Sequence, residues 1–238
     1  FNMYIALNDK HPTSYAVDMT QSGLGLPDLD YYLSDNKGVV ANREAYKKYL
    51  AQMLGLAGVK NPDARAAAVF KLESDMATAH WAAEDRRDPD KTYNPMTVAD
   101  LQKFAPQFPW AAYLQAAGIS ANAPSGPRTL IVAEKSAFPK LAAIFASTPV
   151  SVWRDYLTVR YLHTFASYLP KNIDDANFAM YGQTIRGQKV QLDRPTRGLH
   201  LLDNRMGEAL GKMYVAKYFP PEAKAKAELL VHNMLKAY

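Results

Sequence analysis

The sequence predicts an all-α protein, a multi-helix lobe with at most a small peripheral strand pair. Apolar residues recur at intervals of three and four over most of the chain, which is the period of helices with one buried face. Strand-like runs are confined to residues 129–132 and 189–192. No internal repeat, low-complexity tract or clear linker interrupts the chain, so we expect one helical body over residues 1–238 with roughly 55–65% of its residues helical.

Helix signals in the first half are an apolar stripe, prolines at helix starts and a capping box. They predict helices over residues 46–54, from Pro62 to Glu84 behind an Asn61 N-cap, from Thr97 with its capping partner Asp100, and from Pro109 to a stop at Gly118. In the second half, helices are expected over residues 140–146, 152–169, 197–218 and from Pro221 onward. Residues 23–33 and 121–128 are rich in Gly, Pro, Asn and Asp and are interpreted as loops.

Composition excludes several classes of protein. Hydrophobic residues make up 48% and charged residues 21% of the chain, as in ordinary globular domains. No apolar run approaches the roughly 18 residues of a membrane span. The absence of cysteine excludes disulfides, thiolate zinc sites, iron–sulfur clusters and a cysteine nucleophile.

The charge is unevenly distributed along the chain. Residues 1–120 carry 12 basic and 14 acidic side chains, and residues 121–238 carry 16 and 9. The basic residues of the second half are spaced singly along amphipathic patterns, at Arg194, Arg197, Arg205, Lys212 and Lys217. This spacing favours a solvated helix face or one docked on an acidic partner lobe, and it argues against nucleic-acid binding.

The histidines offer no clear metal or catalytic site. The five lie in separate segments, and the sequence contains neither HExxH nor Glu-x-x-His. The best metal-like set is Glu73, His80 and Glu84, which share one face of an expected helix. A packed, hydrogen-bonded His80 beside Trp81 is the more common arrangement, so we do not predict a metal site there.

Other familiar motifs are also missing. There is no G-x-S-x-G elbow, and Ser125 is expected in a loop. Residues 207–213 have a glycine spacing one short of a phosphate-binding loop, and Gly23 and Gly25 lack the third glycine of a dinucleotide fingerprint.

One charge-dense segment, Glu84–Lys91, allows two interpretations. Arg86 or Arg87 could clamp a carboxylate, because a guanidinium forms paired bonds with that group. We favour the alternative, a network of salt bridges at a helix end. The residues alone therefore identify no catalytic and no metal-binding position.

Ordered segments along nearly the whole chain resemble the N-terminal region of the neprilysin and endothelin-converting-enzyme family of zinc metallopeptidases. The family's GLPxxDYY stretch is matched by residues 22–33, and its LE…RDP…YNxM series by Leu72-Glu73, Arg87-Asp88-Pro89 and residues 93–96. Further matches are Phe108-Pro109-Trp110, Phe178, Tyr181-Gly182, Gly187, residues 210–214 and Tyr218-Phe219. One departure is Pro195-Thr196, where the family usually has an Arg-Trp pair.

The resemblance implies a two-lobed enzyme whose catalytic lobe carries HExxH, a further Glu ligand and the zinc. This chain is similar to the second, helical lobe, which covers the active-site cavity and restricts substrates to oligopeptides. No catalytic or metal-binding residue of the family can be carried over, and the substrate-binding residues stay unidentified. We therefore expect this fragment to be inactive and to bind no cofactor, with its own C-terminal catalytic lobe as partner.

The ends of the chain and its composition suggest a longer, exported protein. The first residue is Phe1, and the helical pattern of residues 229–238 has no stop signal, so we expect further chain on both sides. Animal members of the family tend to have cysteines and Asn-x-Ser/Thr sites, and this sequence has neither. We therefore expect a bacterial member located in the periplasm or outside the cell. The alternative is a free-standing helical binding module that has lost the protease half.

Overall fold

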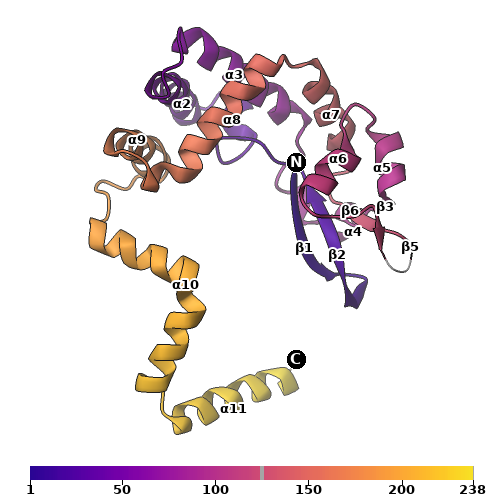
Figure 1. Ribbon diagram of the computed structural model, residues 1–238, viewed down its shortest axis with the longest axis vertical. Helices are drawn as coiled ribbons and strands as arrows, with labels where there is room; N and C mark the ends of the chain where they lie inside the picture. Colours follow the sequence, from indigo (N-terminus) through magenta and orange to yellow (C-terminus); the bar gives the residue numbers. More distant parts are fainter. Residues whose placement is uncertain (124–125, 238) are drawn as a thin grey trace. The chain divides into compact units, whose positions relative to one another are not determined.

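The computed structural model describes residues 1–123 and 126–237 (Figure 1). The predominantly helical class is confirmed, since 64% of the residues are helical. The backbone divides into two compact units, Phe1–Gln188 and Lys189–Tyr238.

The first unit contains a four-stranded sheet in the order β1-β2-β6-β3. Its strands are β1 (Asn2–Asn8), β2 (His11–Thr20), β6 (Thr129–Val132) and β3 (Pro95–Thr97). The β2–β6 pair is parallel and the other two pairs are antiparallel. A two-stranded ribbon joins β4 (Asn122–Ala123) to β5 (Gly126–Pro127), within the predicted loop.

The sheet is larger than the strand pair that the sequence predicts. Residues 129–132 form a strand as expected, whereas residues 189–192 do not. The β1–β2 hairpin was not predicted. Sequence-based prediction of a strand relies on regular alternation of buried apolar and exposed polar residues. In the outer half of this hairpin the apolar residues Ile5, Leu7 and Tyr15 are exposed, so that alternation is absent.

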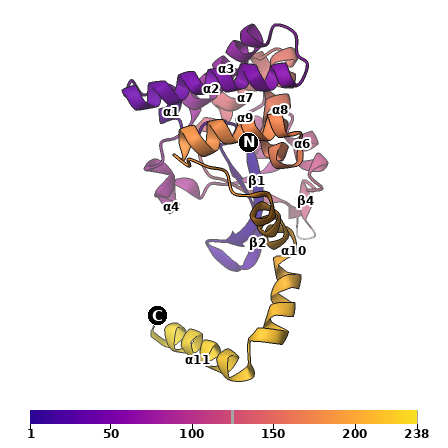
Figure 2. The ribbon, with the colours of Figure 1, turned by 90° about the vertical axis from the view of Figure 1, so that its left-hand side faces the viewer.

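The first unit also contains two groups of helices, one beside this sheet and one farther from it (Figures 1 and 2). The long helices α2 (Lys37–Leu56), α3 (Pro62–Ala79) and α8 (Val150–Phe165) pack on one another. Shorter elements complete the unit: α1 (Asp30–Leu33), η1 (Asp85–Arg87), α4 (Pro89–Thr92), α5 (Val98–Phe104), α6 (Trp110–Ala116), α7 (Ala137–Ser147), η2 (Ala166–Tyr168), α9 (Lys171–Asn177) and the π-helix η3 (Phe178–Ile185).

Some predicted helix ends are right and others need correction. The capping box of Thr97 and Asp100 is confirmed. Asn61 is not a side-chain cap, because its backbone is left-handed with φ of 53° and its amide makes no capping bond. Helix α3 ends at Ala79 rather than Glu84. His80 has an extended backbone, and the Trp81 N–H donates to the side chain of Gln21, which directly follows β2.

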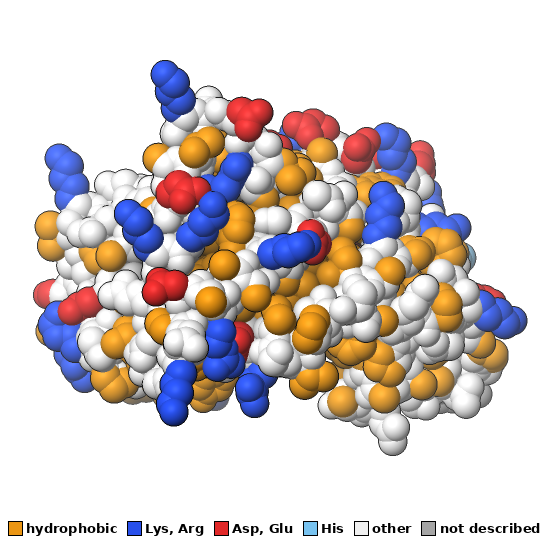
Figure 3. Space-filling view, turned by 90° about the horizontal axis from the view of Figure 1, so that it is seen from above, with side chains coloured by type: hydrophobic (Ala, Val, Ile, Leu, Met, Phe, Trp, Pro, Cys, Tyr) orange, Lys and Arg blue, Asp and Glu red, His pale blue; other side chains and the backbone are white. Residues whose placement is uncertain are grey.

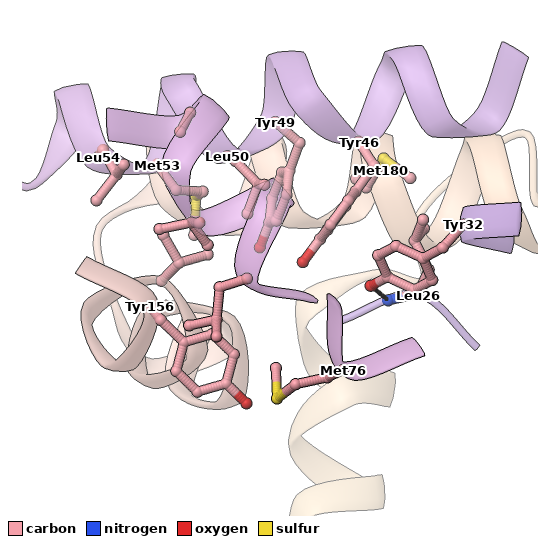
Figure 4. Packing of buried hydrophobic residues seen from close by; sticks show 14 of the residues in the cluster. Leu26, Tyr32, Tyr46, Tyr49, Leu50, Met53, Leu54, Met76, Tyr156 and Met180 are labelled. Carbon is pink, nitrogen blue, oxygen red and sulfur yellow. Dashed lines mark hydrogen bonds between the residues drawn. The ribbon is translucent and has the colours of Figure 1, made fainter. Parts of the chain in front are cut away.

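The first unit has two hydrophobic cores. One lies among α2, α3, α8, α9 and η3, and Figure 4 shows its tyrosines and methionines interdigitated. The other lies between the sheet and α5, α6 and α7. Trp110 is fully buried in this second core, where its indole N–H donates to the Ala105 carbonyl over 2.8 Å. The rings of Phe1 and Phe108 lie with their centroids 4.6 and 4.5 Å from that of Trp110.

The second unit consists of α10 (Arg194–Tyr218) and α11 (Pro221–Ala237). The helix predicted over residues 197–218 is confirmed and begins three residues earlier, where Asp193 accepts the Thr196 N–H. Helix α11 begins at Pro221 as predicted. Helix α10 is kinked at Met206, whose φ is −133°. Neither helix has a buried residue.

Replacing Trp110 with Ala should destabilise the first unit by about 3–5 kcal/mol, because the substitution leaves a cavity and removes a buried hydrogen bond. The measurement is urea unfolding followed by circular dichroism. Val150→Ala is the control: this side chain is 83% exposed, and its loss should change stability by less than about 0.5 kcal/mol. Equal effects of the two substitutions would contradict the placement of Trp110 in a core.

Candidate functional site

The segment Gly23–Leu26 runs through the helical core with its backbone bonded to side chains. The Tyr156 hydroxyl donates to the Gly23 carbonyl over 2.7 Å, and the Arg160 guanidinium donates to the Leu24 carbonyl over 3.1 Å. The Tyr181 hydroxyl donates to the Gly25 carbonyl over 2.9 Å. Side chains from α8 and η3 therefore satisfy three successive carbonyls that no strand or helix pairs.

The N–H groups of the same segment bind to Tyr32. Its hydroxyl accepts from the N–H groups of Gly25 and Leu26, over 3.0 and 2.9 Å, and donates to a carboxylate oxygen of Glu73 over 2.7 Å. The other Glu73 oxygen accepts from the Tyr46 hydroxyl over 3.1 Å. We call this arrangement of Gly23–Leu26, Glu73 and the surrounding tyrosines and Arg160 the tyrosine clamp.

Close packing makes glycine necessary in the clamp. A Cβ on Gly25 would collide with the Tyr46 hydroxyl, which cannot move away because it is fully buried and bonded to Glu73. Gly23 has a φ of +116°, a backbone conformation that other residues rarely adopt. The two glycines that fail as a dinucleotide fingerprint therefore have a structural role.

Burial controls the ionisation of the clamp. It raises the pKa of Glu73 to about 7, against the opposing effect of the bonds from Tyr32 and Tyr46. Burial also raises the pKa of Tyr156 to about 12 and moves the pKa values of Tyr32, Tyr46 and Tyr181 further upward. The tyrosines therefore remain neutral donors, and Glu73 has no exposed oxygen with which to attack or protonate a substrate.

A small polar pocket adjoins the clamp. Its volume is about 180 Å³, and residues 21–24, 26–29, His80 and Arg86 line it. The Nε2 atom of His80 is buried without a hydrogen-bond partner in the described chain. Burial lowers the pKa of His80 to about 4, so the ring is neutral near pH 7. General acid–base catalysis needs a group whose pKa lies near the working pH. His80, with a pKa of about 4 and a partly exposed arginine beside it, does not meet this requirement.

The three residues considered as a metal-like set in the sequence are not brought together. Glu73 is enclosed by tyrosine hydroxyls, His80 ends α3, and Glu84 lies beyond the helix on the surface. Across residues 1–123 and 126–237, no three His, Asp or Glu side chains gather where they could hold an ion. The side chains of these described residues therefore do not fit a zinc ion.

The charged segment Glu84–Lys91 forms the predicted salt-bridge network. Lys91 pairs with Asp85 over 3.0 Å. Arg86 donates through Nε to the buried Glu134 over 2.9 Å, and the other Glu134 oxygen accepts the Gln21 N–H over 2.8 Å. These bonds join the end of β2 to the segment that follows α3. Arg86 therefore binds a carboxylate of the protein itself, as the salt-bridge interpretation predicts.

The remaining candidates also lack a reactive arrangement. Residues 207–213 lie inside α10, so the phosphate-loop interpretation has no support. Ser125 lies outside the described residues. Basic side chains are scattered singly among acidic ones over the face shown in Figure 3. No helix of the described residues is both long and apolar enough to cross a membrane.

The second unit exposes the largest set of apolar side chains. Those of α10 include Met213 at 70% and Tyr214 at 60% exposure, and those of α11 include Leu235 at 72%. Large apolar surfaces on a protein usually mark a contact with another protein surface. We call the exposed apolar side chains of α10 and α11 the C-terminal apolar surface: Leu199, Leu201, Leu202, Met206, Leu210, Met213, Tyr214, Val215, Tyr218, Leu229, Leu230, Val231, Met234 and Leu235.

Comparison with known sequences links the whole chain to one family. The model of peptidase family M13 matches residues 1–238. Endothelin-converting enzyme 1 of Rattus norvegicus is 26% identical over 240 residues, covering 100% of this chain and 31% of the relative. Endothelin-converting enzyme-like 1 of Homo sapiens is 24% identical, covering 98% of this chain and 30% of the relative. The chain thus spans about a third of the length of the curated relatives it matches.

Comparison with solved structures agrees. Zinc metalloprotease Zmp1 of Mycobacterium tuberculosis, in its open state, has a TM-score of 0.87 and 34% identity, covering 100% of this chain and 36% of that one. PepO from Lactobacillus rhamnosis has a TM-score of 0.80 at 19% identity, covering 99% of this chain and 37% of that one. At that lower identity the similarity concerns the fold alone. The matched part is the N-terminal region of these peptidases.

Replacing Glu73 with Gln should remove a pH dependence of stability. The folded protein raises the pKa of this carboxyl from 4.5 to about 7. Between pH 4.5 and about 7, Glu73 therefore keeps its proton in the folded protein and loses it in the unfolded chain. The contribution of this group is full below pH 4.5 and is lost as pH rises through about 7, by on the order of 3 kcal/mol. Urea unfolding at several pH values should show this decline in the wild type and not in Glu73→Gln.

A second variant tests the sign of this effect. Tyr46→Phe removes a hydrogen bond that lowers the pKa of Glu73, so the decline in stability should extend to higher pH than in the wild type. A Glu73→Gln protein that loses stability as steeply as the wild type over this range would contradict the assignment to Glu73.

Proposed function

This chain belongs to peptidase family M13, and from that premise we propose that it is the non-catalytic N-terminal lobe of a neprilysin-like zinc metalloendopeptidase. The lobe covers the active-site cavity and restricts substrates to oligopeptides. The observation that carries the proposal is the family match along the whole chain, which spans only about a third of its relatives. Zinc and the groups that act on the peptide bond belong to the remainder of the enzyme.

The structure of the chain supports a role in shape rather than in chemistry. The fully buried Glu73 carboxyl is enclosed by tyrosine hydroxyls, and the polar pocket beside the clamp holds about 180 Å³. The helices of the chain form a well-packed body around the tyrosine clamp. A water-activating zinc needs a sheltered cavity, and a rigid helical lobe can supply one wall of it.

The C-terminal apolar surface supports a partner within the same enzyme. A helix normally buries its apolar face, and here two successive helices bury no residue in the described chain. We assign this surface to contact with the catalytic lobe. The excess of basic side chains in residues 121–238 favours an acidic partner surface.

The solved bacterial relatives and the absence of cysteine and glycosylation sites favour a bacterial enzyme. We propose that it is exported to the periplasm or outside the cell. Fractionation of cells that express the complete gene tests this location, and recovery of the protein only in the cytoplasm overturns it.

The isolated 238-residue chain should neither bind zinc tightly nor cleave peptides, because a catalytic zinc needs three protein ligands and an open water position. The test is a zinc titration with a fluorogenic-peptide assay, repeated on the protein encoded by the complete open reading frame. Cleavage by the complete protein alone, abolished by a chelator, is the expected result. Chelator-sensitive cleavage by the isolated chain overturns the proposal, and a complete reading frame without HExxH favours a free-standing binding module instead.

Acidic substitutions in the C-terminal apolar surface should weaken association with a separately produced catalytic lobe. Leu210→Asp combined with Met213→Asp places charges where apolar contacts are expected, so we expect the dissociation constant to rise roughly tenfold or more. The measurement is isothermal titration calorimetry. Asn204→Asp adds one negative charge at an exposed polar position of α10 and should have a much smaller effect, because it removes no apolar contact. A wild-type chain that remains monomeric at high concentration and does not bind the catalytic lobe contradicts this assignment.

A further inference from the structure

Strand β1 forms an open edge of the sheet. It is the outermost strand in the order β1-β2-β6-β3 and pairs with β2 on one side only. In the part of the chain that the structure describes, alternate N–H and C=O groups along its other side therefore have no strand to bond with. An exposed strand edge of this kind is a template for another extended backbone.

Nothing in the sequence of β1 protects this edge. Proteins commonly guard open edges with charged residues, prolines or bulges. The seven residues Asn2–Asn8 contain no charge and no proline. The register with β2 is regular from Asn2 to Leu7 and shifts only between Leu7 and Asn8, at the turn. The edge is therefore uninterrupted over about six residues.

One face of the hairpin beside this edge is apolar and exposed. Leu7 pairs directly with Tyr15, and Ile5 lies two residues before Leu7 on the same face. These three side chains are 55%, 76% and 66% exposed. On the same face, Val17, which pairs with Ile5, and Met19 are buried in the sheet core. The apolar face of the hairpin thus extends from the sheet core to a part that no helix of the described chain covers.

The hairpin is also held in place at its turn. The Tyr93 hydroxyl donates to the Asn8 side chain over 2.9 Å, and Lys10 pairs with Asp90 over 3.4 Å. These contacts anchor the turn to the segment around α4. A strand that is fixed before binding loses less conformational entropy when a partner pairs with it.

From these observations we infer that β1 binds an extended oligopeptide, which adds to the sheet beside β1 with apolar side chains at alternate positions facing Ile5, Leu7 and Tyr15. The unpaired backbone groups demand a partner with a regular array of donors and acceptors, which an extended peptide supplies. The exposed apolar face of the hairpin then favours peptides that have apolar side chains at every second position. This inference rests on the proposed function, because it makes the docked strand part of a peptidase substrate.

The test follows amide hydrogen exchange of residues 2–8 by mass spectrometry, in the 238-residue chain and in the chelator-treated complete protein. The probe is a capped hexapeptide of alternating Val and Thr, compared with the same peptide N-methylated at alternate residues. We expect the first peptide to slow exchange in β1 and the methylated one to have no effect. Ile5→Lys with Leu7→Lys should raise the half-saturating peptide concentration roughly tenfold or more, since both contacts are lost.

Val150→Lys is the control, because it adds a positive charge at an apolar position of α8 that is 83% exposed, and it should leave peptide binding unchanged. Circular dichroism establishes that each variant is folded. Unchanged exchange with the unmodified peptide overturns the inference, even where the complete protein cleaves peptides and the proposed function stands. Pairing with β2 already slows exchange of the inward-facing amides of β1. Slow exchange of the outward-facing amides without peptide also overturns the inference: dependence on protein concentration would identify a second copy as the occupant, and protection only in the complete protein would identify another of its own segments.

Discussion

The hydrogen bond from Tyr32 to Glu73 links the parts of the helical core. Tyr32 lies in α1 and Glu73 in the middle of α3, and the same tyrosine hydroxyl receives two backbone N–H groups of the segment Gly23–Leu26. A buried carboxylate without such donors would cost several kcal/mol, and so would a buried backbone without partners. Here the Tyr32 hydroxyl provides a hydrogen-bond partner both for the Glu73 carboxyl and for the backbone N–H groups. The path of the chain between the sheet and α2 therefore depends on this contact.

The helices were predictable because each of them has a local signal. Apolar spacing predicted the stripe of α2, and the capping box at Thr97 marked the start of α5. Proline marked the starts of α3 and α11. These signals act within one or two helical turns, so no knowledge of the tertiary fold was needed. The resemblance to the neprilysin family is confirmed by the match along residues 1–238.

The tyrosine clamp could not be predicted in the same way. Its members are separated by up to 158 residues, from Gly23 to Tyr181, and only the folded chain brings them together. The sequence contained one indication of the clamp: Tyr46 and Tyr49 occupy positions in the apolar stripe of α2 that aliphatic residues commonly fill. A buried tyrosine usually needs a partner for its hydroxyl. Helix α3 was predicted too long for a related reason, since the side chain of Gln21 captures the Trp81 N–H from a distant part of the sequence.

The spread of the clamp along the sequence has a consequence for synthesis on the ribosome. The glycine segment is made early, but its carbonyls obtain partners only when Tyr156, Arg160 and Tyr181 have left the exit tunnel. Until then a growing chain can form α2 and α3 as local helices, but it cannot close the loop around Gly23–Leu26. The helical core of the first unit therefore cannot be completed before η3 is made. A nascent chain stopped before that point exposes the apolar residues of this core to chaperones and proteases.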